Sequence, residues 1–77
     1  MDMAMKIRIA LLKRNMSITE LAEKLGTSRS NLSGKLSRNN FSTQDLVDIA
    51  AALDCDLEMN FIMKDTSEKI QYRFQIV

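Results

Sequence analysis

The sequence contains no histidine, proline or tryptophan, and it has one cysteine and two glycines in 77 residues. A lone cysteine cannot form an internal disulfide bond, which is typical of a reducing compartment, and we expect the Cys55 thiol to be buried or half-buried. Without histidine or a second cysteine there is no ligand set for a transition metal, so we expect no metal site. We also expect no enzyme and no cofactor, because no nucleophile and base can be paired and the chain is short for a sizeable pocket.

Flexible segments and long apolar runs are also missing. Both glycines, Gly26 and Gly34, lie in one short stretch, so nothing indicates a linker or a low-complexity region. The longest apolar stretch is near the N-terminus and is interrupted by Lys6 and Arg8, which excludes a membrane span or a secretory signal there. We expect a single cytoplasmic domain with no membrane partner.

The net charge of +1 conceals an uneven distribution. Residues 1–40 carry eight basic and three acidic side chains, a net charge of +5, whereas residues 41–77 carry three basic and seven acidic ones, a net charge of −4. Such a division is compatible with a polyanion on one side of the molecule and a different partner on the other. It is equally compatible with two solvated faces.

Helical signals fill the first two thirds of the chain. An apolar stripe runs through residues 2–15, and Ser17 followed by Glu20 forms a capping box that opens a second helix, which Gly26 closes. A third helix begins after Thr27 or Ser28, and a fourth after Ser42 or Thr43. We predict a mostly α fold: a bundle of four to five helices over residues 1–56, followed by a C-terminal β-hairpin over 57–77.

The hairpin prediction depends on a change of period from helical to two. Apolar residues alternate with polar ones in 57–64 and again in 70–76, and Asp65 to Glu68 between them have turn chemistry. An isolated hairpin is marginal in water, so its apolar face must cover the helices or a second copy of itself. We favour a homodimer, because the last strand would otherwise leave a long unprotected edge. The predicted interface residues are Phe61, Tyr72, Phe74 and Ile76, and the alternative is a lid that completes a monomeric core.

The stretch Leu21-Ala22-Glu23-Lys24-Leu25-Gly26-Thr27-Ser28-Arg29 is the most specific part of the sequence. With the capping box before it and helices on both sides, the chain resembles the lambda-repressor-like family of helix-turn-helix proteins, the Xre/Cro group, over roughly residues 5–57. The resemblance implies a DNA-binding transcriptional regulator whose third helix enters the major groove of double-stranded DNA.

The resemblance also implies the residues that contact DNA. The base-reading positions are Ser28, Arg29, Ser30, Asn31 and Ser33. Arginine suits guanine and asparagine suits adenine through paired hydrogen bonds, although both could also belong to a solvated helix start. The phosphate contacts that we predict are Ser17, Arg14, Lys35, Arg38, Asn39 and Asn40.

The third helix departs from the family pattern. Relatives usually have an apolar residue at position 35, often glutamate at 36, and glycine at 38. This chain has Lys35, Leu36 and Arg38 there, so the sequence does not define where the helix ends. Gly34 stands where relatives often have a base-reading side chain, so this chain is expected to read fewer bases. A glycine inside a helix also indicates that the helix packs closely against another backbone at this position or that it frays there.

Two alternatives to a DNA-binding regulator remain. One is a protein-interaction module, such as an antitoxin-type partner that keeps the fold with little direct DNA reading and binds a protein through its acidic C-terminal half. The weaker one is a purely structural or assembly domain.

Overall fold

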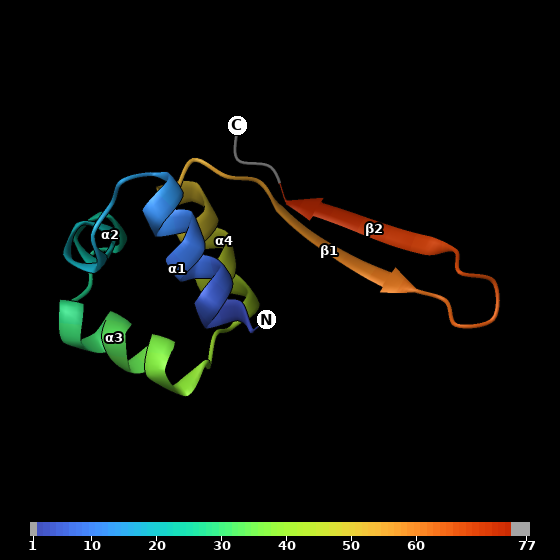
Figure 1. The fold of residues 1–77 in the computed structure, drawn as a ribbon, viewed down its shortest axis with the longest axis horizontal. Helices are drawn as coiled ribbons and strands as arrows, with labels where there is room; N and C mark the ends of the chain where they lie inside the picture. The colour runs from blue at the N-terminus through green and yellow to red at the C-terminus, as the bar shows by residue number, and fades with distance from the viewer. Residues whose placement is uncertain (1, 75–77) are drawn as a thin grey trace.

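The computed structural model describes residues 2–74 and shows a four-helix bundle from which a two-stranded hairpin projects (Figure 1). The helices are α1 (Met3–Lys13), α2 (Ile18–Leu25), α3 (Arg29–Arg38) and α4 (Thr43–Ala52), and the strands are β1 (Leu57–Ile62) and β2 (Lys69–Phe74). The predicted fold class is therefore confirmed, with four helices in the described part of the chain. Of the predicted interface residues, Ile76 lies outside the described residues, and so do the side chains of Tyr72 and Phe74.

Local capping signals set most of the helix boundaries. The side chains of Asp2, Ser17, Ser28 and Ser42 each accept a hydrogen bond from the backbone at the start of α1, α2, α3 and α4, respectively. These bonds satisfy N–H groups that have no partner within a helix. Of the caps that the sequence left undecided, the structure selects Ser28 for α3 and Ser42 for α4. Asn39, at a left-handed φ of 50°, ends α3.

One apolar core joins the four helices, and no residue of β1 belongs to its buried centre. Leu21 is 0% exposed and Leu32 is 2% exposed, and they are the largest side chains that are fully buried. The buried cluster consists of Ala4, Ile7, Leu11, Leu21, Ala22, Leu32, Leu36, Ile49 and Leu53. Burying one such leucine contributes roughly 1.5–3 kcal/mol, so this cluster is the main source of stability in the bundle.

The hairpin is antiparallel, and its register agrees with the alternation in the sequence. Leu57 pairs with Phe74, Met59 with Tyr72 and Phe61 with Ile70, while Glu58 pairs with Arg73 and Asn60 with Gln71. Successive residues of a strand point to opposite faces, so Leu57, Met59 and Phe61 share one apolar face, with Ile70 opposite Phe61. In the turn between the strands, the N–H of Met63 donates to the carbonyl of Glu68 at 2.8 Å. The N–H of Ser67 donates to the carbonyl of Met63, also at 2.8 Å.

The hairpin extends away from the bundle, on the side remote from α3 (Figure 1). The radius of gyration is 13.8 Å, against about 11.5 Å expected for a compact domain of this length. Leu57, the first residue of β1, is half-buried, but the side chain of Phe61 is 78% exposed and that of Ile70 is 55% exposed. The apolar face of the hairpin therefore meets the helices only at its base.

Candidate nucleic-acid interface

The turn between α2 and α3 is held by a glycine in the left-handed conformation. Gly26 has φ 70° and ψ 31°, and its N–H donates to the carbonyls of Ala22 and Glu23. The N–H of Thr27 donates to the carbonyl of Ala22 at 3.0 Å. This pairing closes the last turn of α2, and the buried Ala22, 2% exposed, lets the two helices pack closely. The predicted helix-turn-helix geometry is thus present.

The start of α3 presents the predicted base-reading residues. Arg29 and Ser30 are exposed, and within residues 2–74 no protein group accepts a hydrogen bond from the Arg29 guanidinium. Ser28 is exposed but uses its hydroxyl to accept from the N–H of Asn31 at 3.1 Å. Ser33 is half-buried on the flank of the helix. Arg29 and Ser30 are therefore the two residues of the set with the most freedom to bind a ligand.

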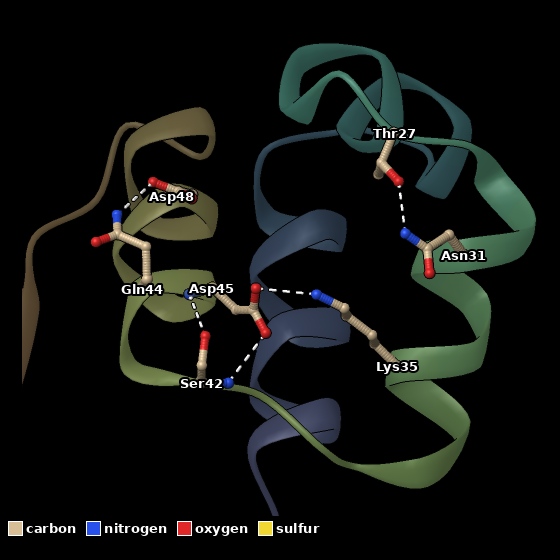
Figure 2. A network of polar contacts seen from close by, with 7 residues as sticks. All are labelled: Thr27, Asn31, Lys35, Ser42, Gln44, Asp45 and Asp48. Carbon is tan, nitrogen blue, oxygen red and sulfur yellow. Dashed lines mark hydrogen bonds and ion pairs between the residues drawn. The ribbon is translucent and has the colours of Figure 1, made fainter.

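Asn31 is exposed but points back toward the turn. Its Nδ2 donates to the hydroxyl of Thr27 at 2.7 Å, as Figure 2 shows. The side chain is oriented before any ligand arrives, and its carbonyl oxygen is left as the principal acceptor. Asn31 consequently lies on the side of α3 that faces α4, rather than at the centre of the outward face.

An ion pair joins α3 to α4. The Nζ of Lys35 lies 2.9 Å from the Oδ1 of Asp45, with 34% and 27% of the two side chains exposed. Asp45 also accepts from the N–H of Ser42 at 2.9 Å, and Ser42 accepts from the N–H of Asp45 at 3.0 Å, which completes a capping box (Figure 2). Bonds from the Ser42 backbone and from Lys35 hold the pKa of Asp45 below its ordinary value.

A small cleft lies between these helices. It has a volume of about 110 Å³ and is bordered on its polar side by Asn31, Lys35 and Asp45. Sites for drug-sized ligands usually occupy about 300–1,000 Å³. The cleft is too small for such a ligand, and the polar network along it serves to fix α3 against α4.

Two further residues predicted to contact phosphate make bonds that join segments of the bundle. The Nε of Arg14 donates to the carbonyl of Leu53 at 2.8 Å, and its Nη2 donates to the carbonyl of Asp54 at 2.9 Å, where α4 ends. Asn39 accepts from the N–H of Ala4 at 2.9 Å and so joins the end of α3 to the start of α1. Sequence reasoning missed both roles, because the partners are 39 and 35 residues apart.

The capping box at Ser17 changes how α2 could bind a phosphate. Ser17 accepts from the N–H of Glu20 at 3.1 Å, and the Glu20 carboxylate accepts from the N–H of Ser17 at 3.3 Å. This carboxylate places negative charge beside the helix N-terminus. In the described chain, the N–H groups of Ile18 and Thr19 remain as donors there. A phosphate at this position would bind these amides and the Ser17 hydroxyl in competition with Glu20.

The single cysteine is exposed, so the expectation of a buried thiol was wrong. Cys55 follows the left-handed residue Asp54, φ 57°, which turns the chain out of α4 toward β1. Its sulfur lies 3.4 Å from the carbonyl of Leu53 and 3.8 Å from the Arg14 guanidinium. No group of three or more acidic or cysteine side chains that could hold a metal ion occurs among residues 2–74.

Comparison with protein families identifies the arrangement. The family model described as the Cro/C1-type HTH DNA-binding domain matches residues 6–58. The chain belongs to this family. The match covers the bundle and the first residues of β1, so the helix-turn-helix just described belongs to a DNA-binding domain. Comparisons with curated proteins and with solved structures find no significant match.

Membership of the family agrees with the resemblance that the sequence suggested, and it makes double-stranded DNA a partner of this domain. None of the helices within residues 2–74 is both long enough and apolar enough to cross a membrane.

Proposed function

We propose that the protein is a sequence-specific transcriptional regulator that places α3 in the major groove of DNA. The observation that carries this proposal is the start of α3, where Arg29 and Ser30 stand exposed ahead of the buried Leu32. A helix fits the major groove, and an arginine there can bind guanine through two parallel hydrogen bonds. Rigid packing beneath the helix keeps these groups in one geometry.

The base-reading set is proposed as Ser28, Arg29, Ser30, Asn31 and Ser33. Arg29 is assigned the largest share of specificity, because its guanidinium has no acceptor within the described chain. Ser28 and Asn31 already make bonds at 3.1 Å and 2.7 Å within the turn. They would add contacts through the atoms that those bonds leave available.

Phosphate contacts are proposed at the end of α3, at the end of α1 and at the start of α2. Asn40 is exposed on the loop that leaves α3 and requires no rearrangement. Ser17, Arg14, Lys35 and Asn39 would have to share their groups between DNA and the internal bonds described above. We therefore expect Asn40 to contribute directly and these four residues to act mainly by holding the surface in shape.

A salt titration with duplexes selected from a random pool tests this function. Affinity should fall as salt rises, with a slope of about −0.9 per neutralised phosphate in a double logarithmic plot. Arg29→Ala should lose about 1–3 kcal/mol on the selected site and discriminate less at one base pair. Arg29→Lys is the charge-matched control, since it keeps the charge but loses the planar pair of donors. Absence of duplex binding at low salt would reject the proposal.

A homodimer formed through the hairpin completes the proposal. The apolar face contains Leu57, Met59 and Phe61 on β1 and Ile70 on β2. The register pairs Leu57 with Phe74 and Met59 with Tyr72, and none of these six residues is charged. Two copies can therefore meet through this face without burying a charge. At its base lies an apolar groove of about 190 Å³ between α1 and α4, lined in part by Ile7, Ala10 and Leu57, which extends the same surface onto the bundle.

Sedimentation equilibrium measures this association directly. A dimer whose dissociation constant rises when the apolar face is made polar supports the proposal, and a monomer at all concentrations rejects this part of it. Two domains on DNA would bind half-sites about 34 Å apart, or a multiple of that spacing. Palindromic selected sites would agree with the dimer, whereas single half-sites would not.

The exposed hairpin also favours a second candidate function, a protein-interaction module of the antitoxin type. Phe61 at 78% exposed and Ile62 at 64% exposed are unusual on a surface without a partner. Two acidic residues of the C-terminal half are engaged within the bundle, since Asp45 pairs with Lys35 and Asp48 accepts from Gln44 at 2.9 Å. A monomeric protein that fails to bind duplex DNA would favour this candidate.

A further inference from the structure

Gly34 lies at the middle of the outward face of α3. Leu32 and Leu36 are each 2% exposed and mark the side of the helix that faces the core. With 3.6 residues per turn, the residue two positions from each of them lies on the opposite side. Ser30 and Arg38 are one turn before and one turn after Gly34, so they belong to the same outward stripe. A side chain at position 34 would stand at its centre.

The guanidinium of Arg38 fills the place of that missing side chain. A Cβ atom added to Gly34 would lie 3.1 Å from Nη1, 3.4 Å from Nη2 and 3.6 Å from Cζ of Arg38. Arg38 therefore folds back by one turn and lies against the helix backbone at Gly34. An alanine at position 34 would require this flexible guanidinium to shift by a few tenths of an ångström, and a larger side chain would displace it further. Glycine leaves room for the contact, although it is less favourable than alanine in the interior of a helix.

The same guanidinium has no acceptor within residues 2–74, and its side chain is exposed. It differs in this respect from Arg14 and Lys35, whose charged groups bind the carbonyl of Leu53 and the carboxylate of Asp45. Nη1 and Nη2 lie nearer than Cζ to that Cβ position, so the guanidinium meets Gly34 with its edge and not with its flat face. Its paired donors match the two acceptors of guanine.

We propose that Arg38, held over Gly34, is a base-reading residue of α3 that recognises guanine in place of a side chain at position 34. This inference rests on the proposed function, since it requires α3 to enter the major groove. It reassigns Arg38 from the phosphate contacts, because phosphates flank the groove while this stripe faces its floor. The Arg38 guanidinium then contacts the base that a side chain at position 34 would contact, so the outward face of α3 does not lack a base contact at Gly34.

The test measures affinity for the selected duplex and for every single-base variant of it. Arg38→Ala and Arg38→Lys should each lose about 5- to 150-fold discrimination at one G·C pair, which corresponds to one bidentate contact. Discrimination at the other pairs should stay as in the unmodified protein. Arg38→Lys keeps the charge, so a loss shared by both variants separates base reading from charge.

Gly34→Ala provides an independent arm. Its melting temperature should rise, because alanine favours the helix, and discrimination at the same G·C pair should weaken, because Arg38 must shift by a few tenths of an ångström. The double variant Gly34→Ala/Arg38→Ala should discriminate no worse at that pair than Arg38→Ala alone. Ser37→Ala is the control, since it also raises helix propensity but already has a Cβ atom, and its discrimination should be unchanged.

The outcomes separate this inference from the function on which it rests. If Arg38→Ala weakens all duplexes equally and reduces the salt slope by about one phosphate, Arg38 is a phosphate contact and the inference is wrong. Unchanged affinity and discrimination in Arg38→Ala would also overturn it. In both cases binding by the unmodified protein would leave the proposed function intact, whereas failure of the unmodified protein to bind any duplex would reject both.

Discussion

In the helical bundle, apolar side chains from four helices meet in one core, whereas in the hairpin the side chains of Met59, Phe61, Ile62 and Ile70 are exposed. Leu21 in α2 is 0% exposed, while Phe61 in β1 is 78% exposed. The two regions also differ in their polar contacts. The bundle is closed by long-range bonds such as that from Arg14 to Leu53, 39 residues apart, whereas Gln71 and Glu58 bond at 2.7 Å within the hairpin itself.

The difference shows which part of the molecule is complete by itself. The bundle satisfies its caps and buries its apolar stripes, so it can hold α3 in one geometry. The hairpin satisfies its backbone bonds but leaves its apolar face uncovered, and a two-stranded hairpin is marginal alone. Substitutions in the two regions should therefore affect different measurements: unfolding for the bundle and association for the hairpin.

The largest effect is expected for Leu21→Ala in the core of the bundle. Truncating a fully buried leucine costs about 2–5 kcal/mol, because transfer energy is lost and a cavity remains. Urea unfolding followed by circular dichroism measures this change. The control is Leu12→Ala, since Leu12 is 81% exposed and its loss should change the free energy of unfolding by less than about 0.5 kcal/mol. Equal effects at both positions would contradict the core that we describe.

A smaller effect, on association, is expected for Phe61→Ser in the hairpin. Removing a central aromatic residue from an interface costs about 2 kcal/mol, or roughly a thirtyfold rise in the dissociation constant of the dimer. The helical content of the bundle should stay the same. Asn60→Ser, on the other face of the same strand, should leave association unchanged. Sedimentation equilibrium distinguishes the two variants, and an unchanged dissociation constant in Phe61→Ser would argue against this interface.

Ser42→Ala tests the N-cap of α4, which lies in the loop between α3 and α4. Loss of an N-cap hydroxyl costs about 1 kcal/mol of stability, here because the N–H of Asp45 loses its acceptor. Thr43→Ala is the matched control, since the sequence left either residue as the cap and the structure places Thr43 inside the helix. Thermal unfolding of both variants measures the difference. A larger loss in Thr43→Ala would move the start of α4 by one residue.

The smallest effect concerns pH and the ion pair between Lys35 and Asp45. The pKa of Asp45 is lowered by its bonds to Ser42 and Lys35, so its contribution is present above the pKa of the unfolded chain. It is lost as pH falls through the lower pKa of the folded state. Asp45→Asn should remove this acid-dependent part, which is below about 1 kcal/mol for a partly exposed pair.

Urea unfolding of the unmodified protein and of Asp45→Asn, from neutral to acidic pH, measures this contribution. Asp48→Asn on the same helix is the control, because Asp48 accepts from the amide of Gln44 rather than from a lysine. If the difference in stability between the unmodified protein and Asp45→Asn stays constant down to the lowest pH, the ion pair does not contribute.

Much of the fold could be predicted because its signals are local. The capping box at Ser17 and Glu20, the turn at Gly26 and the buried stripe through Leu32 each depend on residues within one or two helical turns. The register of the hairpin likewise follows from alternation, because a shift by one residue would exchange its apolar and polar faces. Arg29 was correctly placed at the exposed start of α3 for the same reason.

The state of the charged and polar side chains could not be predicted in this way. The sequence suggested the same role for Arg14, Lys35, Arg38 and Asn39, yet the structure gives each a different neighbour. The spacing of Gly34 and Arg38 by one helical turn was a local signal for their contact. By contrast, nothing in the sequence near Asn39 indicates that it accepts from Ala4.

The sequence by itself determined the elements, their caps and the turn that presents α3, because hydrogen bonds and hydrophobic periodicity within a segment act over a few residues. Only the tertiary structure decided which charges are engaged and which face outward, because that depends on where segments 35 to 39 residues apart come together. It also showed that the hairpin leaves the bundle, since Leu57 alone in β1 is half-buried and the rest of the strand is exposed. The four helices bury their apolar side chains in one core, whereas β1 leaves every residue after Leu57 exposed.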